Sequence, residues 1–66
     1  MKIVVEYHGN IYESAEIKTH TAEQLKDKMF KNIEDIGKFE MELNRGGFIV
    51  IGEDAIKSCI IRFFDT

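Results

Sequence analysis

The sequence predicts an α+β domain in the order β-β-α-β-β-β, built as one mainly antiparallel sheet with a single helix on one face. Two observations carry this prediction. In residues 22–36 the apolar residues recur at helical spacing, and the segment is bounded by a capping motif and a glycine. In residues 39–64 apolar residues alternate with polar ones, or run together between glycine-bearing turns, which is typical of strands.

The first two predicted strands form a hairpin. Residues 2–8 alternate between apolar and polar side chains, and residues 11–19 return after the turn formers at 9–10.

The register of this hairpin depends on the length of its turn. A two-residue loop at positions 9–10 would place Glu6 directly opposite Glu13, and a like-charge pair of this kind is destabilising. A loop one residue longer instead pairs Ile3 with Ile17. We predict the longer loop.

The helix is predicted over residues 22–36. Thr21 and Gln24 have the spacing of a capping box, in which each side chain bonds to the backbone of the other residue. Gly37 stands where a glycine commonly ends a helix. One stripe with spacing 3-4-4-3, widened by Phe30, would face the sheet: Ala22, Leu25, Met29, Ile33 and Ile36.

The last three predicted strands hold most of the strongly apolar residues. Residues 39–43 alternate strictly, residues 48–51 are apolar at every position, and residues 55–64 carry apolar side chains on both faces. Strands that are apolar on both faces are normally covered on both. A single helix covers one face, so we expect the other to form an interface through these residues: Phe48, Val50, Ile56, Ile60 and Phe64.

Size and charge restrict the classes of function. A single domain of 66 residues buries a small core, and its one cysteine excludes an internal disulfide, so we expect a homo-oligomer, a dimer or higher. The net charge of −3 is spread along the chain, which argues against a nucleic-acid partner. No apolar run reaches the length of a membrane span, and no signal peptide is indicated, so a cytoplasmic location without a membrane partner is expected.

Residues capable of chemistry are few and scattered. His8 and His20 adjoin a turn and the helix cap, Cys59 is expected in a buried strand, and Glu53-Asp54 is expected in a turn. We interpret all of them as structural residues. The sequence thus predicts a protein that is not an enzyme, with no catalytic residue, no metal site and no cofactor.

A small ligand site is the main alternative. Aromatic side chains stack on bases and cationic ones contact phosphates, so a nucleotide held between subunits would use these residues: Tyr7, Tyr12, Arg45, Lys57 and Arg62. The same tyrosines would also suit a weak single-stranded nucleic-acid binder, but Glu6, Glu13 and Glu16 in the same hairpin oppose that function.

Residues 47–51 followed by residues 54–61 resemble the closing hairpin of many small uncharacterised phage and prophage accessory proteins. The proline-free composition, rich in Lys, Ile and Glu, is similar to that of proteins from AT-rich bacterial or phage genomes. The resemblance implies small accessory products, often oligomeric, that bind and block a host enzyme or capture a signalling nucleotide. It assigns no role to any residue.

The sequence therefore favours a non-enzymatic cytosolic interaction protein, such as a phage-type inhibitor, that binds a host protein through a sheet face or edge strand. The alternatives are an oligomeric protein that sequesters a nucleotide and a weak single-stranded nucleic-acid binder.

Overall fold

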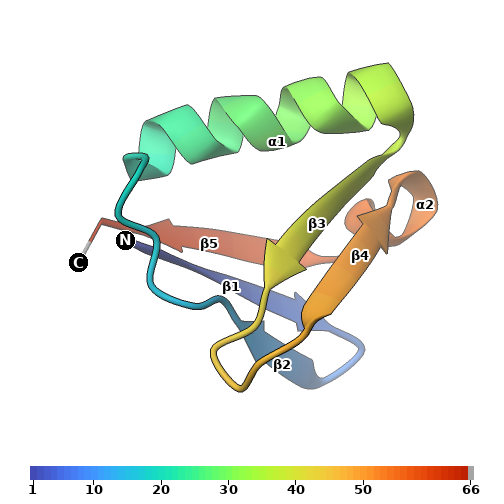
Figure 1. Cartoon of the computed structure of the whole chain (residues 1–66). Coiled ribbons are helices and arrows are strands. Elements are labelled where there is room, and N and C mark those ends of the chain that lie inside the picture. The colour runs from blue at the N-terminus through green and yellow to red at the C-terminus, as the bar shows by residue number, and fades with distance from the viewer. Residues whose placement is uncertain (66) are drawn as a thin grey trace.

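The computed structural model describes residues 1–65 and confirms the α+β class, with five strands and one main helix (Figure 1). The elements follow in this order: β1 (Lys2–Tyr7), β2 (Asn10–Glu13), α1 (Ala22–Ile36), β3 (Lys38–Glu42), β4 (Phe48–Gly52), α2 (Glu53–Ile56) and β5 (Ile60–Phe64). Helix α2 is one short turn that the sequence analysis did not predict.

The strands form two antiparallel sheets, whereas one sheet was predicted. One sheet has the order β2-β1-β5, and the other is the β3–β4 hairpin. They meet at a single bridge between Ser14 and Leu43. There the Ala15 N–H donates to the Glu42 carbonyl over 2.9 Å. Within residues 1–65 the two sheets are therefore joined only along this short stretch, and elsewhere they pack face to face.

The core lies between the two sheets and α1. In Figure 1 the β3–β4 hairpin lies in front of β1 and β5, and α1 runs along the side where β5 lies. The hairpin is thus a second cover for the inner face of the β2-β1-β5 sheet, in addition to the expected helix. The buried apolar side chains come from β1, α1, β3 and β4, together with the first residue: Met1, Ile3, Val5, Leu25, Met29, Phe39, Met41 and Ile51.

Helix α1 has the predicted bounds because both of its ends are capped. The Gln24 N–H donates to Thr21 Oγ1 over 3.2 Å, and the Thr21 N–H donates to Gln24 Oε1 over 2.9 Å. Gly37 ends the helix with a left-handed φ of 72°. The predicted stripe was too wide, since Phe30 and Ile36 are exposed.

The β1–β2 hairpin has a different turn from the predicted one. Its two-residue loop is His8-Gly9, where φ is 50° and 81°, and Tyr7 pairs with Asn10. Positive φ at both loop residues is the pattern of a type I′ turn, whose twist matches that of the strands. The predicted register was wrong because the predicted loop, residues 9–11, starts one residue too late and is one residue too long. In the observed register Glu6 lies opposite Ile11, so no like-charge pair forms.

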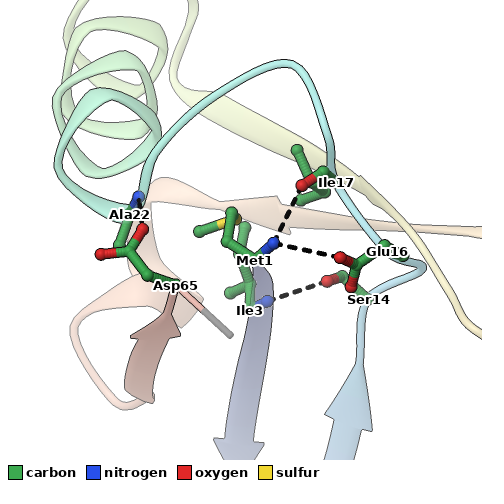
Figure 2. Close-up of polar contacts among 7 residues, drawn as sticks. All are labelled: Met1, Ile3, Ser14, Glu16, Ile17, Ala22 and Asp65. Carbon is green, nitrogen blue, oxygen red and sulfur yellow. Dashed lines mark hydrogen bonds and ion pairs between the residues drawn. The ribbon is translucent and has the colours of Figure 1, made fainter.

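Strand β2 also ends earlier than predicted, because a side chain replaces a backbone partner. The Ile3 N–H donates to Ser14 Oγ over 2.8 Å, and the Ser14 N–H donates to the Ile3 carbonyl over 2.9 Å (Figure 2). After Ser14 the chain turns toward Glu42, so the regular ladder with β1 stops there.

Met1 and Asp65, the first and last described residues, both lie close to the start of α1 (Figure 2). The Met1 nitrogen donates to the Ile17 carbonyl over 3.0 Å and to Glu16 Oε1 over 3.3 Å (Figure 2). Beside them, the Ala22 N–H donates to Asp65 Oδ1 over 2.7 Å. This last bond joins the first turn of α1 to the end of β5.

The predicted strand over residues 55–64 is wrong in its first half. Gly52 serves as the N-cap of α2, and Glu53 and Asp54 occupy its first turn, where negative charge favours a helix. Ile56 is consequently half-buried and packs against the core rather than facing outward from a strand. Cys59 lies between α2 and β5, not within a strand.

Candidate functional site

Strand β4 exposes apolar side chains on its outer face. Phe48 is 69% exposed and Val50 is 58% exposed, whereas Ile51 on the inner face is buried and Ile49 is half-buried. The prediction that this strand is apolar on both faces is therefore confirmed.

The hydrogen-bonding direction of β3 is fixed by two bonds near its end. The Leu43 N–H donates to the Gly47 carbonyl over 2.9 Å, and the Glu42 carbonyl accepts from the Ala15 N–H over 2.9 Å. In a strand, the N–H and C=O of one residue point to the same side, and that side alternates along the chain. The odd-numbered residues of β3 therefore bond to β4, and the even-numbered ones point away from it.

The same alternation defines the outer edge of β4. Met41 lies opposite Ile49, so the odd-numbered residues of β4 bond to β3. The N–H and C=O groups of Phe48 and Val50 then point to the edge away from β3. Within residues 1–65 no other strand pairs with β4. This row of backbone groups is free to accept another strand.

Acidic residues adjoin the exposed apolar pair. Glu40 lies opposite Val50 and Glu42 lies opposite Phe48, while β4 itself carries no charged residue. The outer face of the β3–β4 hairpin is therefore apolar on its free strand, whereas its inner strand carries Lys38 and the two carboxylates. The term "β4 edge" below refers to Phe48–Gly52 with its free backbone groups.

The outer face of the β2-β1-β5 sheet is a different kind of surface. Ile60 is 54% exposed and Phe64 is 41% exposed. Its charges are combined in two ion pairs, Lys2 Nζ with Glu13 Oε1 at 3.3 Å and Arg62 Nη1 with Glu6 Oε1 at 3.8 Å. This face therefore combines exposed apolar residues with paired charges, and an antiparallel sheet commonly leaves one face in water.

The predicted interface residues thus do not form one surface. Phe48 and Val50 belong to the β4 edge, and Ile60 and Phe64 belong to the other sheet. Ile56 is half-buried in the short helix α2.

Three of the five predicted ligand residues line two cavities that share Tyr12. Tyr7 and Tyr12 line an apolar cavity of about 210 Å³ between the inner faces of the two sheets, together with Cys59 and residues 49–51 of β4. Tyr12 also lines a second cavity of about 420 Å³, which includes Arg45. Tyr12 therefore lines both cavities, with Tyr7 in the first and Arg45 in the second.

The other two predicted ligand residues lie elsewhere. Arg62 is on the opposite face of the sheet from the tyrosines, where it pairs with Glu6. Lys57 is exposed at the end of α2 and lines neither cavity.

His8, His20 and Cys59 lie in three different segments of the fold. His8 lies in the β1–β2 turn, and His20 Nδ1 lies 2.8 Å from Thr19 Oγ1 before α1. Burial raises the pKa of the Cys59 thiol, whose Sγ donates to the Ala55 carbonyl over 3.1 Å. In the described part of the chain no three His, Cys, Asp or Glu side chains gather as a metal site would require.

Two surface features escaped the sequence analysis. Ile11 is the second most exposed of the large apolar residues, although it lies in a strand. A groove of about 380 Å³ separates α1 from β3 and contains Lys28, Lys38 and Glu40. The uncharged run of residues 48–52 was a signal of an unprotected edge strand, but the sequence does not show on which side β3 would pair.

Comparison of the chain with protein-family models, curated proteins and solved structures found no match. In the described residues, no helix combines the length and apolarity that crossing a membrane requires.

Proposed function

We propose that this chain is a non-enzymatic interaction protein that binds another polypeptide by strand addition at the β4 edge. One observation carries the proposal, the unpaired edge of an uncharged strand on which Phe48 and Val50 are exposed. Natural proteins usually protect such an edge with lysine, proline or a bulge.

Strand addition suits both the backbone and the side chains of this edge. In this mode the free N–H and C=O groups supply affinity, and pockets for alternate side chains supply specificity. Val50 and Phe48 offer apolar contacts on the outer face. On the inner face, the cavity of about 210 Å³ beside Ile49 and Ile51 offers room for an apolar side chain of the added strand.

The test compares single lysine substitutions in capture experiments. A tagged chain is incubated with lysate of the native host and with untagged chain, and the retained proteins are identified by mass spectrometry. Val50→Lys adds a charge to the edge without removing a buried group, so its captured proteins should be lost. Phe30→Lys is the matched control, because Phe30 on α1 is 59% exposed, compared with 58% for Val50. It should retain the same proteins as the unaltered chain.

Ile60→Lys separates the two surfaces. If Ile60→Lys abolishes capture and Val50→Lys does not, the outer face of the β2-β1-β5 sheet is the binding surface and the proposal is wrong. Equal capture by all variants would also contradict it.

A second candidate function is supported by the arrangement of Tyr7, Tyr12 and Arg45. A nucleotide base could stack on a tyrosine while its phosphate contacts Arg45, where the two cavities share Tyr12. Equilibrium dialysis with ATP and with a cyclic dinucleotide tests this function. Binding that is lost in both Tyr12→Ala and Arg45→Ala supports it, and absence of binding at millimolar nucleotide excludes it for these ligands.

A further inference from the structure

We infer that the strand added to the β4 edge is the β4 strand of a second copy of this chain, in a two-fold antiparallel pair centred on Val50. This inference rests on the proposed strand addition and names its partner. It would join the two β3–β4 hairpins into one continuous sheet.

The edge has the geometry that a two-fold pair requires. Strand β4 has five residues, and Val50 is the central one. The backbone groups of Val50 point to the free edge, so Val50 can exchange both hydrogen bonds with Val50 of the copy. In that register Phe48 lies opposite Gly52 of the copy. A glycine opposite an aromatic residue leaves room for the ring to cover its backbone.

The charges distinguish this pairing from stacking of the two hairpin faces. Stacking would bring the outer faces of both β3 strands together, and each carries two carboxylates, Glu40 and Glu42, against one cation, Lys38. In edge pairing the two β3 strands are three strand spacings apart, roughly 14 Å. Charges at that separation are screened at physiological salt, where the Debye length is about 8 Å. Edge pairing therefore joins the uncharged strands and keeps the carboxylates apart.

The inner face of the pair is also complementary. With Val50 opposite its copy, Ile51 of one chain lies beside Ile49 of the other on the inner face. The cavity lined by Tyr7 and Tyr12 adjoins this stretch of β4. The second copy would thus extend the apolar core across the edge and cover the side of the cavity that β4 bounds.

The two outer strands of the other sheet are less suited to this role. Strand β2 has four residues and carries Glu13. Strand β5 carries Arg62, and α1 runs along the side of the molecule where β5 lies (Figure 1). The bond from the Ala22 N–H to Asp65 Oδ1 joins the helix to the end of that strand. Strand β4 itself carries no charge, and the helix next to it is the single turn of α2, which follows Gly52 at the end of the strand.

Sedimentation velocity at micromolar concentration tests the assembly. The unaltered chain should sediment at twice its 7.7 kDa mass, Val50→Lys at the mass of one chain, and Phe30→Lys like the unaltered chain. A strict monomer at every concentration would overturn the inference. If that monomer still captures another protein through Val50, the proposed strand addition stands and only the second copy is excluded.

A covalent test reports the register even if Val50→Lys fails to fold. Opposed residues of a hydrogen-bonded antiparallel pair have Cα atoms about 5.5 Å apart, within the range that a disulfide spans. Mild oxidation of the Val50→Cys, Cys59→Ser variant should therefore give a covalent dimer. The Phe30→Cys, Cys59→Ser variant is the control and should stay monomeric under the same conditions. Equal cross-linking of both variants, or of neither, contradicts a pair centred on Val50.

Discussion

At the residue scale, Ser14 is buried, and both its hydroxyl and its backbone N–H are bonded to Ile3. It is the only buried polar residue within residues 1–65. Its hydroxyl provides an acceptor for the Ile3 N–H at the point where β2 leaves the ladder. Sequence patterns did not reveal this role, because a serine inside an apolar hairpin can equally face solvent.

Ser14→Ala should destabilise the fold strongly for a single-atom deletion. The change leaves the Ile3 N–H buried without its acceptor, and an unpaired buried group of this kind costs about 1–3 kcal/mol. Chemical denaturation followed by circular dichroism measures the free energy of unfolding. Ser58→Ala is the control, because Ser58 is exposed. Equal stability of Ser14→Ala and the unaltered chain would show that another acceptor serves Ile3.

Cys59 should react slowly with thiol reagents at neutral pH. Burial raises the pKa of its thiol, so less of the nucleophilic thiolate is present at a given pH. Labelling should accelerate only when the pH rises above the ordinary range of a cysteine pKa. The same shift means that the folded state favours the protonated thiol. This contribution to stability is present below the unfolded pKa and is lost as pH rises through the folded pKa. Labelling as fast as that of an unfolded control peptide would contradict the assignment.

At the scale of elements, the capping box of α1 was predicted from the spacing of Thr21 and Gln24 and is present in the structure. Thr21→Ala should cost on the order of 1 kcal/mol, because the Gln24 N–H loses its side-chain acceptor. Thermal unfolding monitored at 222 nm measures the loss. Thr19→Ala is the control, since Thr19 is an exposed threonine outside the helix. If both variants melt together, Thr21 does not cap α1.

The helix was predictable and the hairpin register was not, for a physical reason. Thr21, Gln24 and Gly37 act on their immediate neighbours, so their effect can be derived from local spacing. The turn at His8-Gly9 depends on a left-handed conformation at His8, which is uncommon for residues other than glycine. The turn formers Gly9 and Asn10 favoured a loop over residues 9–11 instead, and a change in the position or length of the loop changes every pair in the hairpin.

The last predicted strand illustrates a second limit. Residues 55–64 alternate well enough for a continuous strand, yet Glu53–Ile56 forms a helical turn and only Ile60–Phe64 pairs with β1. The acidic pair after Gly52 was interpreted as a turn, and a helix N-terminus also favours acidic residues. Ile60 and Phe64 nevertheless share one face of β5, as predicted from the alternation, and this face is the exposed one.

At the scale of the whole molecule, the division into two sheets decides where the candidate site lies. A single sheet would have placed the predicted apolar residues on one uncovered face. Instead the β3–β4 hairpin packs over the β2-β1-β5 sheet, and the exposed residues are separated into the β4 edge and the opposite sheet face. This packing brings Tyr7 and Tyr12 beside β4 and leaves Arg62 on the other side. Such proximity depends on tertiary structure and cannot be derived from strand patterns alone.

The melting temperature should depend on protein concentration if the β4 edges pair. Binding that occurs only in the folded state stabilises it by mass action. Well above the dissociation constant, the concentration of free chain grows as the square root of the total. A hundredfold increase in concentration therefore adds about 1.4 kcal/mol to the free energy of unfolding per chain.

For a domain of this size that gain raises Tm by at least about 5 °C. Differential scanning calorimetry at several concentrations should show this rise for the unaltered chain and for Phe30→Lys. Val50→Lys should melt at one temperature throughout, because its charged edge removes the coupling between folding and assembly. A concentration-dependent Tm in Val50→Lys equal to that of the unaltered chain would place the coupling on another surface.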